Sequence, residues 1–98
     1  MMDHINLAIQ ILPMGKAKAE AYALVDEAIR IISASGLKYE VCPFETVIEG
    51  PYREVMKVAE AAQQACFDAG AEDLLVYFKL QRSRGRSVTI EEKTGKYR

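Results

Sequence analysis

The sequence predicts an α+β fold in which a four-stranded antiparallel sheet carries two helices on one face. Segments with the two-residue period of a strand and segments with helical periodicity follow one another in the order βαββαβ. Both long helical segments end at a glycine, Gly36 and Gly70, the residue best suited to the left-handed position just past a helix. A chain of 98 residues is expected to form one domain, 1–98.

The first strand and the first helix have the clearest patterns. Residues 4–12 alternate, so that one face carries Ile5, Leu7, Ile9 and Ile11 and the other carries Asn6, Ala8, Gln10 and Leu12. A helix is expected over residues 17–35, because apolar side chains recur there every three or four positions. Its predicted apolar stripe consists of Tyr22, Val25, Ile29 and Ile32, widened by Ala21 and Ala28.

A hairpin and a second helix come next. Residues 37–41 and 45–49 are predicted strands, and they should pair antiparallel because the three residues between them are too few for a crossover. Pro43 lies at the bend, since it has no amide to donate to a ladder. The second helix is expected to begin at Pro51, a residue favoured at the first helical position. Its predicted stripe consists of Tyr52, Val55, Met56, Ala59, Ala62 and Cys66.

The remaining segments complete the sheet. Residues 73–81 form the last clear strand, and residues 87–91 are predicted as a short C-terminal strand. With right-handed crossovers this order gives the ferredoxin-like βαββαβ sandwich. The first and last of the four main strands are expected at the centre of the sheet. The helix-facing side chains of that last strand are Leu74, Val76, Phe78 and Leu80.

The other face of the predicted sheet has no helix to cover it. This face mixes apolar and polar side chains. It is too apolar to face open solvent and too polar to form a sealed core. We therefore expect it to meet a second subunit or a ligand. Its predicted side chains are Asn6, Ala8, Gln10, Leu12, Leu75 and Tyr77.

Composition and charge exclude several classes of function. The formal net charge is −1, so no overall field attracts nucleic acid or a membrane surface. No apolar run approaches the roughly 20 residues of a membrane span, and the N-terminal residues do not resemble a signal peptide. Cys42 and Cys66 are then expected to be reduced thiols in the cytoplasm. One histidine and no CxxC pair predict no metal site.

The last twenty residues or so are rich in lysine and arginine, which raises the question of RNA. Ferredoxin-like sheets that bind RNA stack bases on a recognisable aromatic run of a central strand. Here Tyr77 is the one aromatic residue expected on the open face, and no such run exists. We therefore interpret the basic residues as a solvated tail or as partners in intersubunit ion pairs, and we expect no nucleic-acid partner.

Two polar residues of the hairpin are the first candidates for a binding site. Thr46 and Glu49 lie on a strand inside the predicted sheet, where a hydroxyl and a carboxylate need partners. Glu49 precedes the start of the second helix and is suited to a cationic group. Strand alternation places Thr46 and Glu49 on opposite faces unless the strand bends or bulges. Glu40 and Glu45 are predicted to face solvent.

Several blocks of the sequence occur in a recognisable order. They are NLAIQILP at 6–13, SGLKYEV at 35–41, TVIEG at 46–50, EVM at 54–56 and AGA at 69–71. Together they resemble the small thiamine-binding protein family of the YkoF-like superfamily, over nearly the whole chain. The resemblance implies a ferredoxin-like fold and homo-oligomers, dimers or tetramers, in which uncovered sheet faces meet. It also implies binding of thiamine or a hydroxymethylpyrimidine-like molecule without enzymatic activity.

The resemblance implies that Thr46 and Glu49 of the hairpin block are ligand-binding residues. It also implies that thiamine is the bound ligand and not a cofactor of catalysis. Glu49 is expected to meet the charge of the cationic thiazolium ring. The side chains of Thr46, Gln10 and Asn6 are expected to hydrogen-bond the amine and ring nitrogens of the pyrimidine.

Aromatic side chains complete the predicted site, since Tyr77 or Phe44 is expected to stack on the flat pyrimidine. Two alternative functions stay open. One is a structural or regulatory homo-oligomer without a small-molecule ligand. The other is a small enzyme that uses Glu45 and Glu49 as an acid–base pair. We expect the binding protein, which is not an enzyme.

Overall fold

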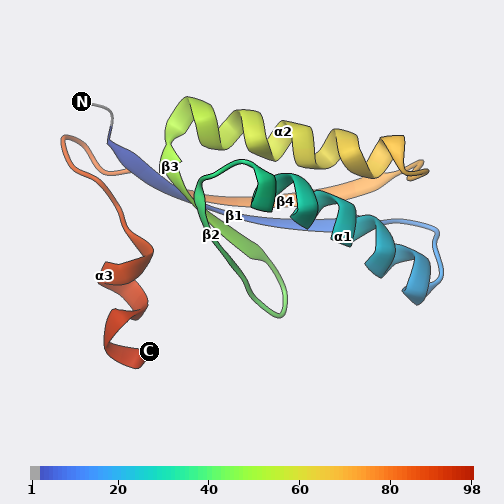
Figure 1. Cartoon of the computed structure of the whole chain (residues 1–98), viewed down its shortest axis with the longest axis horizontal. Helices are drawn as coiled ribbons and strands as arrows, with labels where there is room; N and C mark the ends of the chain where they lie inside the picture. The colour runs from blue at the N-terminus through green and yellow to red at the C-terminus, as the bar shows by residue number, and fades with distance from the viewer. Residues whose placement is uncertain (1–2) are drawn as a thin grey trace.

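The computed structural model describes residues 3–98, which form one four-stranded sheet and three α-helices. The strands are β1 (His4–Pro13), β2 (Lys38–Val41), β3 (Thr46–Pro51) and β4 (Leu74–Gln81). The helices are α1 (Lys18–Ala34), α2 (Tyr52–Asp68) and α3 (Ile90–Thr94), followed by a 3₁₀ turn, Gly95–Tyr97. All strand pairs are antiparallel in the order β2-β3-β1-β4. Figure 1 shows α1 and α2 over one face of this sheet, as the sequence predicts.

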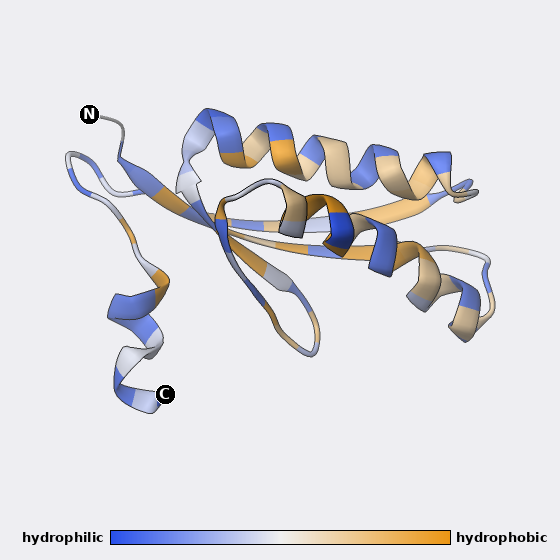
Figure 2. Ribbon diagram, viewed as in Figure 1, coloured by the Kyte–Doolittle hydropathy of each residue, from blue (hydrophilic) through white to orange (hydrophobic). Residues whose placement is uncertain are grey.

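The core lies between the sheet and the two long helices. The inward-facing residues of β1 from Ile5 to Ile11 are all buried, and Leu7 and Ile48, which pair across β1 and β3, are inaccessible to solvent. Ala59 and Ala62 of α2 are also fully buried. Each large aliphatic side chain buried here contributes about 1.5–3 kcal/mol to folding. Figure 2 shows hydrophobic residues along the sheet and a mainly hydrophilic α3.

Both long helices end as predicted, and α1 buries only part of the expected stripe, together with Leu24, which was not in it. Gly36 and Gly70 follow the helices with φ of 80° and 117°. In α1 the buried positions are Leu24, Ala28 and Ile32, whereas Tyr22 is 62% exposed. The prediction for Tyr22 was wrong because α1 carries apolar residues on more than one side, so its contacts with α2 and the sheet select the buried face.

β4 is an edge strand, not one of the two central strands. Within the described residues it pairs with β1 alone, and β3 occupies the second central position. Leu74 and Val76 pack partly against the core, but Phe78 and Leu80 are 41% and 42% exposed. The prediction that all four are core residues was wrong, because an edge strand has a neighbour on one side only.

The predicted C-terminal strand is wrong, because residues 90–94 form α3. The Val88 amide does donate a strand-like hydrogen bond to the His4 carbonyl, 2.9 Å. Thr89 then caps the helix: its hydroxyl accepts from the Glu92 amide (3.0 Å), and its amide donates to the Glu92 carboxylate (2.8 Å). This capping box outweighs the β preference of the surrounding residues. In Figure 1, α3 lies at lower left, away from α1 and α2. No helix in residues 3–98 is both long and apolar enough to cross a membrane.

The capping box should make α3 sensitive to acid. The hydrogen bond from the Thr89 amide, aided by the charge of Arg86, lowers the pKa of Glu92 from its usual 4.5. Because the folded pKa is lowered, this contribution to helix stability is complete above about pH 4.5 and is lost as the pH falls through the folded value. We expect amide protection factors of α3 to fall as the pH drops below about 4.5, as measured by hydrogen exchange. Glu92→Gln should reduce that pH dependence, and an unchanged dependence in this variant would contradict the assignment.

Candidate functional site

A cavity of about 320 Å³ lies on the open face of the sheet beneath α3. We call it the α3 cavity. Its walls come from all four strands and from the C-terminal segment, and its volume is at the lower end of the range for small-molecule sites. Its lining residues are Asn6, Ala8, Glu40, Cys42, Glu45, Val47, Lys79, Leu80, Gln81, Ile90, Lys93, Thr94 and Arg98.

One register row of the sheet forms the floor of this cavity. Glu40 pairs with Val47, Val47 with Ala8, and Ala8 with Lys79. Residues directly opposite in antiparallel strands share a face, so all four side chains lie on the open side. The floor is therefore small and apolar in the middle, with a carboxylate at one end and an ammonium group at the other.

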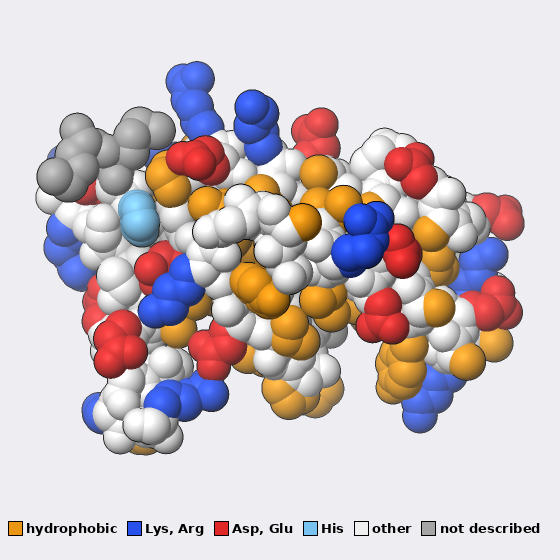
Figure 3. Space-filling view, in the orientation of Figure 1, with side chains coloured by type: hydrophobic (Ala, Val, Ile, Leu, Met, Phe, Trp, Pro, Cys, Tyr) orange, Lys and Arg blue, Asp and Glu red, His pale blue; other side chains and the backbone are white. Residues whose placement is uncertain are grey.

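Two ion pairs cross the α3 cavity. Lys79 Nζ lies 3.2 Å from Glu45 Oε1, and an Arg98 guanidinium nitrogen lies 2.8 Å from Glu40 Oε1. Lys79 and Glu45 meet across β1, where the small side chain of Ala8 leaves room for them. Both carboxylates are partly buried, 28% and 30% exposed. Figure 3 shows acidic and basic side chains interspersed over this end of the molecule, at lower left.

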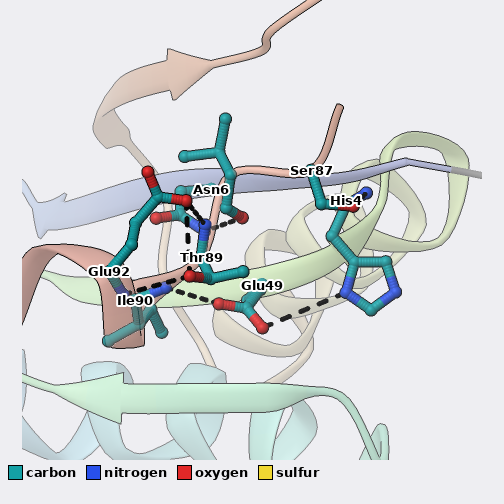
Figure 4. A network of polar contacts seen from close by, with 8 residues as sticks. His4, Asn6, Glu49, Ser87, Thr89, Ile90 and Glu92 are labelled. Carbon is teal, nitrogen blue, oxygen red and sulfur yellow. Dashed lines mark hydrogen bonds and ion pairs between the residues drawn. The ribbon is translucent and has the colours of Figure 1, made fainter. Parts of the chain in front are cut away.

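Two buried polar residues of the sheet hold the C-terminal segment over the cavity (Figure 4). The Ile90 amide donates to Glu49 Oε1, 2.6 Å, and Asn6 Nδ2 donates to the Val88 carbonyl, 3.1 Å. Asn6 and Glu49 are 4% and 9% exposed, and they face each other across β1 and β3. Because an unpaired buried carboxylate or amide is costly, these bonds explain how a sheet interior tolerates both residues.

The structure separates Thr46 from Glu49. Glu49 lies opposite Asn6 on the open face, whereas Thr46 lies opposite Ile9 on the helix-covered face, as strand alternation predicts. Thr46 and Phe44 line a second, smaller cavity of about 100 Å³ at the end of the β2–β3 hairpin, beside α1. Phe44 is 81% exposed there.

The remaining predicted site residues, Gln10 and Tyr77, form a cross-strand pair of β1 and β4. This pair lies on the open face, two positions along β1 from Ala8 and toward the hairpin end. Tyr77 is 53% exposed. Gln10 also lines the smaller cavity with Thr46 and Phe44, whereas Asn6 is the one predicted residue that lines the α3 cavity.

Sequence reasoning missed most of the charged residues of the α3 cavity. Glu40 and Glu45 were assigned to solvent, and the basic residues that include Lys93 and Arg98 to a solvated tail or to intersubunit ion pairs. The sequence signal that was available is the capping box of Thr89 and Glu92, which predicts a helix start rather than a strand. A helix at that point would have suggested a cover for the open sheet face.

One cysteine lies in the core and the other lines the α3 cavity. Cys66 is fully buried, as predicted, and burial raises the pKa of its thiol, so it stays protonated at neutral pH. Cys42 is half-buried at the edge of the α3 cavity. Within residues 3–98 no three side chains suited to metal ions lie together. The chemistry that the α3 cavity presents is that of its charged and amide side chains.

Comparisons with known proteins find similar sequences and structures over nearly the whole chain. Residues 7–98 match the sequence model of the family described as thiamine-binding protein. A UPF0045 protein of Clostridium perfringens is 36% identical over 97 residues, which cover 99% of this chain and 100% of the relative. A Thermotoga maritima structure, named provisionally as a thiamine biosynthesis or salvage protein, is 29% identical with a TM-score of 0.88 and covers 97% of this chain and 99% of its own. A Bacillus cereus DUF77 structure has 38% identity and a TM-score of 0.90, over 98% of this chain and 91% of that one.

Proposed function

Because the chain belongs to the thiamine-binding protein family, we propose that it binds thiamine or a related aminopyrimidine in the α3 cavity. The observation that carries this proposal is the pair of partly buried carboxylates, Glu40 and Glu45, beside an apolar floor. A cationic thiazolium is attracted by the carboxylates, and a flat ring fits over Ala8 and Val47.

The proposal assigns the ligand charge to Glu40 and Glu45 rather than to Glu49. One oxygen of Glu49 accepts the Ile90 amide, and the other lies 3.9 Å from His4 Nδ1. In contrast, Glu40 and Glu45 are paired with the ends of long, mobile side chains that can move aside. Gln81 and Thr94 also line the cavity and supply donors and acceptors for an aminopyrimidine.

We propose a binding protein rather than an enzyme. The acid–base pair considered from the sequence, Glu45 and Glu49, is four residues apart along an extended chain, or about 13 Å at 3.3 Å per residue. In the structure the two carboxylates contact different groups, since Glu45 Oε1 pairs with Lys79 and Glu49 Oε1 accepts the Ile90 amide. These separate contacts support binding over catalysis by that pair.

We also propose that the protein is a cytoplasmic homo-oligomer. Beyond the α3 cavity the open face continues as Leu12, Leu75 and Tyr77, which are 36%, 42% and 53% exposed. A contiguous apolar strip on a sheet face favours burial against a second copy. Both cysteines are free thiols, in keeping with a reducing compartment. Light scattering tests the assembly, and a monomer at micromolar concentration would contradict it.

Titration calorimetry with thiamine tests the proposed binding site. We expect Glu45→Gln to weaken thiamine binding about tenfold, because hydrogen bonds to charged groups are worth about 1.5–3 kcal/mol and the variant leaves Lys79 as an unpaired cation. Thr46→Val is the matched control in the smaller cavity and should bind as the parent does. No heat and no thermal shift at millimolar thiamine would instead favour a structural oligomer. A larger loss in Thr46→Val would move the site to the hairpin cavity.

A further inference from the structure

The α3 cavity holds one more positive side chain than its carboxylates neutralise. Arg98 pairs with Glu40 and Lys79 pairs with Glu45. Lys93 is the third basic residue of the lining, and within residues 3–98 no carboxylate forms an ion pair with it. The charge of Lys93 contributes to the lowered pKa of Glu92, which lies outside the lining, but the lining itself keeps one excess cation. Such an excess beside a partly enclosed cavity favours an anionic group in the ligand.

A hydrogen bond to a buried side chain holds the ammonium group of Lys93 in place. Its ammonium group donates to Asn6 Oδ1, 2.9 Å, and Asn6 is 4% exposed. The Nδ2 group of the same amide donates to the Val88 carbonyl, 3.1 Å, which orients Asn6 so that its oxygen faces Lys93. The ammonium group has three N–H donors and Asn6 accepts one, so donors are left for a ligand.

We propose that the ligand of the α3 cavity is an organic cation that also carries a phosphate ester. This inference rests on the proposed function and names phosphorylated thiamine as the ligand class of the same cavity. The carboxylates of Glu40 and Glu45 hold the ring cation, and Lys93 binds the phosphate oxygens. Plain thiamine adds a second excess positive charge to the cavity, whereas a phosphate monoester, with a charge of about −1.5 to −2 near neutral pH, offsets it.

Comparing thiamine with thiamine monophosphate by calorimetry tests this proposal, at pH 8 and constant ionic strength. We expect the monophosphate to bind about tenfold more tightly, because charge-assisted hydrogen bonds to a phosphate are roughly twice as strong as neutral ones. Lys93→Met should bring the ratio of the two dissociation constants to about one by weakening binding of the monophosphate. Lys93→Arg keeps the charge and should keep the preference.

Matched variants and one further ligand complete the experiment. Lys57→Met, on the exposed surface of α2, should retain the parent preference. Inorganic phosphate should compete with the monophosphate and not with thiamine. Thiamine binding with no preference for the monophosphate, or a preference that persists in Lys93→Met, would overturn the phosphate assignment while leaving the proposed function intact. Failure of both ligands to bind would overturn the two proposals together.

Discussion

Replacing Glu49 with alanine is expected to release α3 from the sheet and to abolish ligand binding, while the core of the domain stays folded. Glu49 Oε1 accepts the Ile90 amide at 2.6 Å in a buried position. Losing a charged acceptor for this amide costs about 2 kcal/mol, or roughly a 30-fold shift toward the released segment. A helix of five residues does not persist without its tertiary contacts. Once α3 leaves, the cavity loses Lys93 and Arg98 together.

Hydrogen exchange and a second substitution separate this effect from general destabilisation. Amides of residues 88–94 should lose protection in Glu49→Ala, whereas amides of β1 and α2 should keep theirs. Glu60→Ala, on the exposed surface of α2, is the control and should change neither set. Glu49→Gln retains an oxygen acceptor and should give an intermediate result. Unchanged protection at Ile90 in Glu49→Ala would show that other contacts hold α3.

The sandwich could be predicted from sequence because its signals are local and repeated. Alternation along β1 gives the correct buried face over its whole length, and the glycines after both long helices have the expected positive φ. The order of the strands in the sheet is harder to predict from sequence, because it depends on which strand lies between two others. Placing the last strand at the centre led directly to the wrong expectation for Phe78 and Leu80, which are partly exposed on the edge strand β4.

The candidate site was harder to predict because it joins residues from both ends of the chain. Glu49 was selected with Thr46 as a polar residue that needs a partner, and Asn6 as a contact of the ligand, but the partners of Asn6 and Glu49 are backbone groups of residues 88 and 90. That contact depends on a short C-terminal helix whose sequence also suits a strand. The row that joins Glu40 to Lys79 depends on three strand registers at once, and a one-residue slip in any of them moves a side chain to the other face.

Replacing Ala8 with phenylalanine is expected to block the α3 cavity with little effect on stability. Ala8 lies at the centre of the floor, between Val47 and Lys79, and its side chain faces the cavity rather than the core. An aromatic side chain there occupies the space of a ligand ring. Overfilling a packed site costs about 1–3 kcal/mol, so thiamine binding should weaken by about fivefold to more than a hundredfold. Phenylalanine is favoured in strands, and the thermal midpoint should stay nearly constant.

Leu12→Phe provides the matched control for this prediction. Leu12 lies on the same open face of the same strand, four residues from Ala8 and outside the α3 cavity, and it is 36% exposed. It should bind thiamine as the parent does. If Ala8→Phe also binds normally while both variants melt like the parent, the ligand does not lie in the α3 cavity. The hairpin cavity of Thr46 and Phe44 then becomes the site to test, and its small volume would require the hairpin to open around a ligand.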